Sequence, residues 1–320
     1  MISGMRTPKK STNTLSFIIP AYNEEKSIEI LTKEIVNVVK KITPNYEIIF
    51  VDDGSTDSTF ETLKKLASKN SSVRVIRHRG NWGKSIALQN GFNLASGEII
   101  FTLDADLQDD PQEIPNFLAK LNDGYDLVTG WKKTRHDPPS KVIPSRIINA
   151  IASNMTGVKI HDTNCGFKAY KKDVVKNLSL YGELYRYIPI FASKQNFRVT
   201  EIIINHRPRK FGKSKFDWTR GIKGILDLMT VFFLTGYAKR PSHFFGSLGL
   251  LSFFFGFVIG LYITYLRVTS GSIQYRYPLL FLGMLLMIIG VQLTTTGLIA
   301  EMIVNYNSKK KTKNTISQTL

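Results

Sequence analysis

The sequence predicts an α/β domain with a doubly wound, largely parallel sheet, followed by a segment that anchors the chain in a membrane. Short apolar runs alternate with amphipathic helical stretches at a spacing of about 25 residues, as in a chain of βαβ units. Clusters of acidic residues follow two of these runs. Beyond about residue 218 the composition changes and becomes strongly apolar.

Four apolar runs are predicted to form the parallel part of the sheet: Leu15–Pro20, Tyr46–Val51, Val73–Arg77 and Ile99–Leu103. Three helices are predicted between them: the first ends near Lys41, the second ends near Asn70 and the third covers Ser85–Ala95. Ser58 or Asp57 is expected to cap the second of these helices.

The fourth run ends in the acidic stretch DADLQDDP. Asp104 and Asp106 are two positions apart, so in an extended chain they share one face, and they repel unless a cation lies between them. Hard oxygen ligands such as these suit Mg²⁺ or Mn²⁺. The alternative is an acidic loop in which Asp109, Asp110 and Pro111 only cap the next helix.

A second acidic loop, DDGSTD, follows the second run, and its Gly54 is suited to a positive φ. Such a loop either binds the base and ribose of a nucleotide or is an ordinary turn and helix cap. A dinucleotide fold is excluded because PAYNEE, after the first run, is not GxGxxG. A Walker A loop is excluded because His78 stands where its first glycine is needed.

Composition limits the function classes. The formal charge of +18 and pI of about 9.8 imply an anionic partner, such as a phosphorylated ligand, a membrane surface or a nucleic acid. The single cysteine, Cys165, excludes an internal disulfide and a cysteine-only zinc site, and fits a reducing compartment. The basic, polar N-terminal stretch has no apolar core behind it, so we expect that the first domain is not exported.

The C-terminal third predicts a two-helix anchor. Gly221–Ala238 is apolar but carries Lys223 and Asp227, which favours an interfacial amphipathic segment over a core helix of the soluble domain. Phe244–Leu266 carries no charged residue and would be about 34 Å long as a helix, enough to span a bilayer. A second span is predicted from about Pro278 to Val304.

Two spans return the chain to its starting side, where a lysine-rich tail joins the basic first domain. The positive-inside rule then places both in the cytoplasm. The predicted parts are 1–218 for the α/β domain, 219–242 for the interfacial helices, 243–307 for the membrane anchor and 308–320 for the basic tail.

Several motifs together resemble family 2 glycosyltransferases of the GT-A fold: PAYNEE (20–25), VDDGSTD (51–57), GNWGKSIALQNGF (80–92) and DADLQDDP (104–111). The stretch 182–216, which contains HRPRKFGKSK, resembles the polyprenyl-phosphate, or dolichol-phosphate mannose synthase-like, branch. The resemblance implies an inverting, metal-dependent transferase in the inner membrane. It would move a hexose of the glucose or mannose class from a UDP- or GDP-linked donor to undecaprenyl or dolichyl phosphate.

The resemblance also implies site residues. The donor nucleotide would be bound by Pro20, Tyr22, Glu24, Asp53, Lys84, Arg209, Lys213, Ser214 and Lys215. Mg²⁺ or Mn²⁺ would be held by Asp106 and Gln108, and the catalytic residues would be Asp104, Asp106 and Asp162. The acceptor phosphate would be bound by Arg135 and Arg146, for which solvated surface charges are the alternative.

Two other functions stay open. A processive polysaccharide synthase also joins this fold to membrane helices, but its QxxRW signature is absent from the sequence. A non-catalytic scaffold that binds nucleotide or anionic lipid is disfavoured by the intact DADLQ and GKSK motifs. Nucleic acid is not an expected partner because no RRM, KH, zinc-finger or basic-zipper signature accompanies the basic segment. Self-association into a homo-oligomer is left open.

Overall fold

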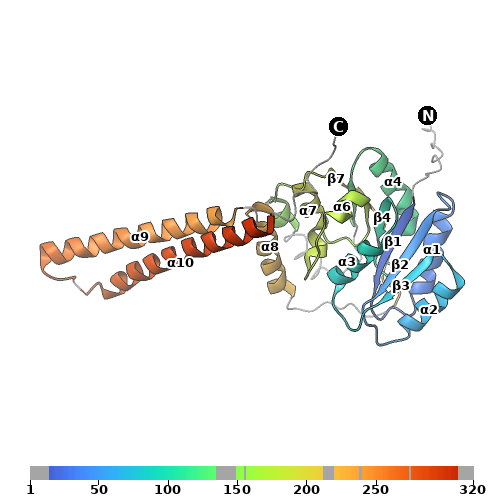
Figure 1. Ribbon diagram of the computed structural model, residues 1–320, viewed down its shortest axis with the longest axis horizontal. Coiled ribbons are helices and arrows are strands. Elements are labelled where there is room, and N and C mark those ends of the chain that lie inside the picture. The colour runs from blue at the N-terminus through green and yellow to red at the C-terminus, as the bar shows by residue number, and fades with distance from the viewer. Residues whose placement is uncertain are drawn as a thin grey trace. The chain divides into compact units, whose positions relative to one another are not determined.

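The computed structural model describes residues 14–134, 149–154, 156–211, 220–237, 240–273 and 275–308. The chain divides into two compact units, with the boundary between Val231 and Phe232 (Figure 1). The first unit holds the sheet and its helices, and the second holds two long helices.

Seven strands form one mixed sheet in the order β3-β2-β1-β4-β6-β5-β7. They are β1 (Leu15–Ala21), β2 (Tyr46–Asp52), β3 (Val73–Arg77), β4 (Ile99–Thr102), β5 (Leu127–Trp131), β6 (Lys168–Lys171) and β7 (Val199–Ile203). The first four strands are parallel to one another, and β5 is parallel to β7. β6 is antiparallel to both of its neighbours.

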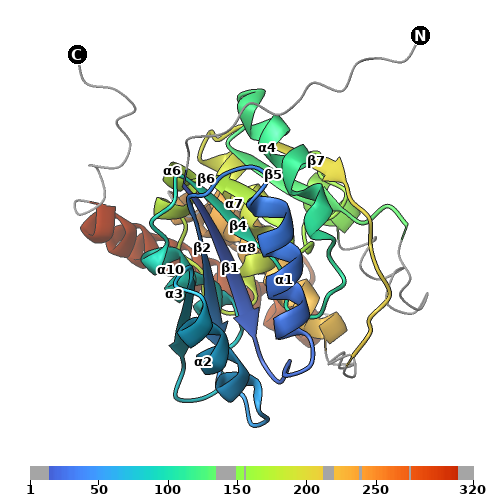
Figure 2. The same cartoon turned by 90° about the vertical axis from the view of Figure 1, so that its right-hand side faces the viewer.

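Helices cover both faces of the sheet (Figure 2). α1 (Ile28–Val39), α2 (Thr59–Lys69) and α4 (Ile114–Asn122) pack on one face, where α4 follows the short 3₁₀ helix η1 (Pro111–Glu113). The other face is covered by α3 (Lys84–Leu94), α6 (Lys172–Lys176) and α7 (Ile188–Lys194), with the 3₁₀ helix η2 (Leu184–Tyr187) before α7. Alternate residues of β1 enter the two cores, Phe17 on one side and Ile18 on the other. This burial on both faces explains why β1 and β4 are nearly continuous apolar runs.

The four strands predicted from apolar runs are confirmed to within one residue at either end. The helix predicted over Ser85–Ala95 begins one residue earlier, at Lys84. The cap expected at Ser58 or Asp57 comes from Asp57, whose Oδ1 accepts a hydrogen bond from the Thr59 amide at 3.0 Å. Asp110 likewise caps η1 by accepting from the Gln112 amide. The acidic loop is therefore a helix cap as well as a cluster of carboxylates.

The sheet directions gather the loops at one edge. The carboxyl ends of β1 to β4 all lie there because these strands are parallel. β6 runs the opposite way, so it begins at that edge, and Lys168 pairs with Thr102, the last residue of β4. The turn that precedes β6 thus lies beside the acidic loop that follows β4.

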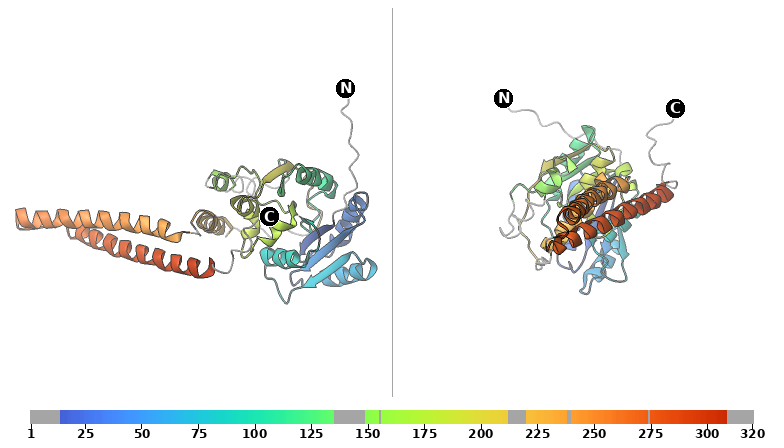
Figure 3. Two further views of the ribbon diagram at one scale, coloured as in Figure 1. Left: turned by 45° about the horizontal axis from the view of Figure 1, so that its top comes forward. Right: turned by 90° about the vertical axis from the view of Figure 1, so that its left-hand side faces the viewer.

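The second unit is a helical hairpin of α9 (Pro241–Ser270) and α10 (Tyr277–Ser308), seen side by side in Figure 3. Both are long and apolar enough to cross a membrane, as predicted. They touch through glycines: a Cβ on Gly256 would lie 2.6 Å from the Gly283 carbonyl oxygen, and one on Gly249 would lie 2.6 Å from that of Gly290. The Glu301 carboxylate accepts from the Ser242 amide and hydroxyl at the start of α9.

The predicted interfacial segment corresponds to α8 (Arg220–Gly236). Its helical structure is confirmed, while its place at a membrane surface stays a prediction. The boundaries expected at residues 218, 242 and 307 likewise stay predictions, since the compact units divide within α8. The lysine-rich tail lies outside the described residues.

Candidate functional site

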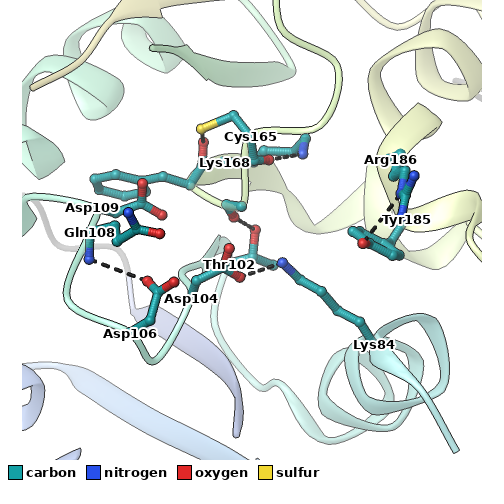
Figure 4. A network of polar contacts seen from close by, with 12 residues as sticks. Lys84, Thr102, Asp104, Asp106, Gln108, Asp109, Cys165, Lys168, Tyr185 and Arg186 are labelled. Carbon is teal, nitrogen blue, oxygen red and sulfur yellow. Dashed lines mark hydrogen bonds and ion pairs between the residues drawn. The ribbon is translucent and has the colours of Figure 1, made fainter. Parts of the chain in front are cut away.

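The acidic loop after β4 forms the centre of the site (Figure 4). Leu107 takes a positive φ of 63°, which turns the chain sharply between Asp106 and Gln108. Asp104 forms an ion pair with Lys84, the first residue of α3. Burial raises the pKa of Asp104, but the charges of Lys84 and Lys132 outweigh burial, so the pKa lies below its usual value. Asp104 is therefore a stable carboxylate.

The pKa of Asp106 is shifted in the opposite direction. Burial, followed by the charges of Asp104 and Asp109, raises its pKa to about 6. Arg209, which follows β7, opposes this shift, and its Nη2 lies 2.5 Å from Oδ2 of Asp106. The position is thus one where a carboxylate needs a cation, and a guanidinium supplies that charge in this structure.

The segment after β7 is fastened to the acidic loop at several points. The Arg207 amide donates to the Gln108 carbonyl at 2.9 Å, and the Arg207 guanidinium pairs with Glu34 at 2.7 Å and Asp110 at 2.6 Å. Asp109 is almost completely buried and pairs with Lys132 at 2.8 Å. These contacts hold Arg209 over Asp106 and explain how two stretches distant in sequence form one site.

The loops after β1, β2 and β3 form a second part of the same edge. The Asp53 carboxylate accepts from the amides of Trp82 and Gly83 at 2.9 and 2.8 Å, and Nδ1 of His78 lies 2.7 Å from it. Asp53 therefore positions the loop before α3. Beside it lies a hollow of about 500 Å³ lined by Gly54, Ser55, Arg77, His78 and Arg79.

Gly54 is required in this loop. Its φ is +72°, and a Cβ there would lie 2.5 Å from the backbone of Gly80. The prediction that Gly54 takes a positive φ is confirmed. The close approach of the two glycines joins the β2 and β3 loops at the rim of the hollow.

The turn at residues 162–166 approaches the acidic loop from β6. Asp162 is buried, and its Oδ1 accepts from the Asn164 amide at 3.2 Å. The Thr102 hydroxyl donates to the Gly166 carbonyl at 2.8 Å, and the Lys168 ammonium donates to the Cys165 carbonyl (Figure 4). A Cβ on Gly166 would lie 2.4 Å from Oδ2 of Asp104, so the backbone of this turn is in direct contact with that carboxylate.

These features are accompanied by a match to the family model for glycosyl transferase family 2 over residues 16–179. The chain belongs to glycosyl transferase family 2. A dodecaprenyl-phosphate galacturonate synthase from Rhizobium johnstonii is 36% identical to it over 307 residues, covering 94% of this chain and 90% of that protein. An undecaprenyl-phosphate 4-deoxy-4-formamido-L-arabinose transferase from Photorhabdus laumondii is 35% identical, covering 90% and 88%.

Solved structures confirm the expected GT-A-type fold of this family 2 chain. Glucosyl-3-phosphoglycerate synthase from Mycobacterium tuberculosis, crystallised with Mn²⁺, UDP-glucose and phosphoglyceric acid, superposes with a TM-score of 0.55. That match has 20% sequence identity and covers 70% of this chain and 81% of the other. At this identity the likeness concerns the fold.

The site residues expected of a family 2 enzyme are largely brought to the one edge. They are Pro20, Tyr22 and Glu24 at the end of β1, Asp53 after β2, Lys84 at the start of α3, Asp104, Asp106 and Gln108 after β4, Asp162 before β6, and Arg209 after β7. Arg135, Arg146, Lys213, Ser214 and Lys215 lie outside the described residues. The individual roles of all these residues stay predictions.

The sequence did not predict the positions of three residues of the site: Lys132, Lys168 and His78. Lys168 is buried beside the acidic loop, the partly buried Lys132 pairs with Asp109, and His78 bridges Asp53 and Asn90. The position of Lys168 could not be predicted, because the four residues KAYK do not show that a strand forms there or that it pairs antiparallel with β4. The nearby signal was Asp162, which the resemblance implies to be catalytic and which lies in the same stretch, HDTNCGFK.

Proposed function

We propose that this chain is a membrane-anchored transferase that moves a sugar from a nucleotide donor to a polyprenyl phosphate. The observation that carries the proposal is the extent of the likeness to the R. johnstonii protein. The alignment of 307 residues covers 94% of this chain and therefore includes both the sheet unit and the helical hairpin. The two units thus occur together in a protein named for a polyprenyl-phosphate product. A lipid phosphate at the membrane surface is the acceptor that such a pairing suits.

The acidic loop fits a divalent cation. Asp106 has a pKa raised to about 6 because it is buried near two further carboxylates, and a bound cation would relieve that repulsion. Within the described residues no three His, Cys, Asp or Glu side chains converge on one point. This suits Mg²⁺ or Mn²⁺, which is commonly held by one or two carboxylates together with substrate phosphates and water.

In this proposal Asp106 and Gln108 hold the ion. When bound, the ion would neutralise the diphosphate leaving group as a Lewis acid. Lys84 adds a positive charge beside Asp104, and Arg209 supplies a guanidinium able to pair with diphosphate oxygens. Asp104 and the buried Asp162 then orient the sugar between them.

The nucleophile is the acceptor phosphate. A phosphate monoester has its second pKa near 6, so it is already an anion at neutral pH and needs no strong base. One of its oxygens attacks the anomeric carbon, the bond from that carbon to the diphosphate breaks, and a nucleoside diphosphate leaves. A single displacement of this kind inverts the anomeric centre, and positioning supplies much of the rate.

The sugar and the nucleotide stay predictions. A glucose- or mannose-class hexose on UDP or GDP is what the sequence leads us to expect. The names of the two relatives carry galacturonate and 4-deoxy-4-formamido-L-arabinose. A donor panel must therefore include uronates and amino pentoses besides neutral hexoses.

The experiment uses purified full-length protein with radiolabelled donors, Mn²⁺ or Mg²⁺, and undecaprenyl or dolichyl phosphate in detergent. We expect a labelled lipid with one donor, loss of product on chelation, and a fall of at least about 100-fold in Asp106→Asn. Asp173→Asn, at an exposed position on α6, is the matched control and should leave product formation unchanged. Absence of lipid product from the whole donor panel would refute the proposal.

A further inference from the structure

Lys168 is a charged side chain that the proposed mechanism does not use. It is the first residue of β6 and only 2% exposed. Among the described residues its ammonium has no carboxylate within ion-pair distance, and its contact is the hydrogen bond to the Cys165 carbonyl (Figure 4). Burying an ammonium without a direct ion pair is costly, so the position calls for a reason.

The reason lies in what the Cys165 carbonyl belongs to. It is part of the turn 162–166, which carries Asp162 at one end and touches Asp104 with Gly166 at the other. Thr102, at the end of β4, holds the next carbonyl of the same turn at 2.8 Å. Lys168 and Thr102 are paired residues of neighbouring strands, so both hydrogen bonds to the turn come from residues of the sheet.

We propose that Lys168 is a positioning residue for sugar transfer. Its ammonium holds the turn 162–166 against Asp104 and thereby fixes Asp104 and Asp162 relative to each other. The inference rests on the proposed function, in which these two carboxylates orient the sugar. It adds a residue and a charge requirement that the mechanism above does not contain.

The charged hydrogen bond from Lys168 to the turn depends on pH. Burial lowers the pKa of Lys168 to about 8, and the charge of Lys84 acts in the same direction. Asp162 and Asp104 act against it. Burial raises the pKa of the neighbouring Cys165 thiol to about 12, so that thiol stays neutral in the relevant range. Above about pH 8 the ammonium therefore loses its proton, and the turn loses its charged hydrogen bond.

The test compares Lys168→Met, which keeps the length and loses the charge, with Lys168→Arg, which keeps the charge at all accessible pH values. Lys171→Met is the matched control, since Lys171 lies on the same strand and pairs with Asp126 away from the acidic loop. Lipid product formation is measured from pH 6 to 9.5 with saturating and limiting donor, and folding is followed by thermal unfolding.

We expect Lys168→Met to lower kcat about 100-fold with a donor KM within about threefold of wild type, as befits misplacement of reacting groups. The wild-type kcat should fall above about pH 8, and Lys168→Arg should be active without that fall. Lys171→Met should match wild type. Loss of catalysis in Lys168→Arg as deep as in Lys168→Met, or an unchanged kcat in Lys168→Met, would overturn the inference.

The wild-type profile alone keeps the inference testable if a variant does not fold. A wild-type kcat that stays level from pH 7 to 9.5 would contradict a role for the ammonium. The two proposals fail in different ways. If the wild type makes no lipid product, the proposed function fails, whereas an active wild type with an equally active Lys168→Met overturns only the role of Lys168.

Discussion

Gly166 shows at the scale of one residue how closely the site is packed. The Asp104 carboxylate occupies the space that any side chain at position 166 would need. A larger residue must push Asp104 away from Lys84 or push the turn 162–166 outward. Either movement separates the groups that the mechanism requires together, so activity should be more sensitive than stability at this position.

Gly166→Ala is therefore expected to lower kcat by about 100-fold. The matched control is Gly97→Ala, before β4 at the opposite edge of the sheet, whose Cβ would lie 2.6 Å from Ser16 Oγ and 2.8 Å from the Ser16 backbone nitrogen, a similar crowding that leaves Asp104 and the turn 162–166 untouched. Both changes should cost about 1–3 kcal/mol of unfolding free energy, as overpacking does. Equal losses of kcat in the two variants would show that crowding alone, and not the Asp104 contact, limits activity.

Lys168 also predicts how stability depends on pH. Its pKa in the folded chain, about 8, lies below the ordinary 10.5, so between these values the unfolded chain binds more protons. The contribution of this lysine to the free energy of unfolding therefore rises with pH over that window, while activity falls. The thermal unfolding midpoint of wild type minus that of Lys168→Met should rise from pH 8 to 10. A difference that falls over this range would contradict the lowered pKa of Lys168.

At the scale of elements, the sequence was most informative for β1, β2 and β4, which are buried on both faces. These three strands were predicted because their apolar runs are nearly continuous and bounded by turn residues. β6 was not predicted, since four residues, KAYK, carry no periodicity and its pairing depends on residues far away in sequence. The acidic loop was thus predicted, and the positions of Lys132 and Lys168 beside it were not.

The helical hairpin allows a prediction of its own, because α9 has glycines in two environments. A Cβ on Gly256 would meet the Gly283 carbonyl and Met287, whereas one on Gly260 would meet nothing within 4 Å. Gly256→Ile should separate the helices and lower the midpoint of thermal unfolding in detergent by several degrees, at a cost of about 1–3 kcal/mol. Gly260→Ile should leave it near wild type. Equal effects would mean that helix propensity, and not packing, decides the outcome.

The whole molecule joins a GT-A-type domain to two helices that are long and apolar enough to cross a membrane, and its membrane topology is predicted from charge. The positive-inside rule predicts that the sheet unit lies in the cytoplasm and the α9–α10 loop on the other side of the membrane. The single native cysteine suits a labelling test, because Cys165 is buried and its pKa is raised to about 12 by burial, which makes it a poor nucleophile.

With a membrane-impermeant maleimide, Ser272→Cys in the α9–α10 loop should be labelled in intact spheroplasts. Asp173→Cys, on the exposed surface of the sheet unit, should be labelled only after the membrane is opened. Wild type should remain unlabelled in both conditions. Labelling of Asp173→Cys in sealed spheroplasts would contradict the predicted orientation.

The central claim is that a lipid phosphate oxygen displaces a nucleoside diphosphate from the sugar. The most direct measurement is the nucleotide released during lipid glycosylation by the purified full-length chain, separated by anion-exchange chromatography and compared with the lipid product. We expect one nucleoside diphosphate for each sugar transferred, and a lipid that carries a single phosphate. Release of a nucleoside monophosphate, with two phosphates on the lipid, would show transfer of a sugar phosphate instead and contradict the account.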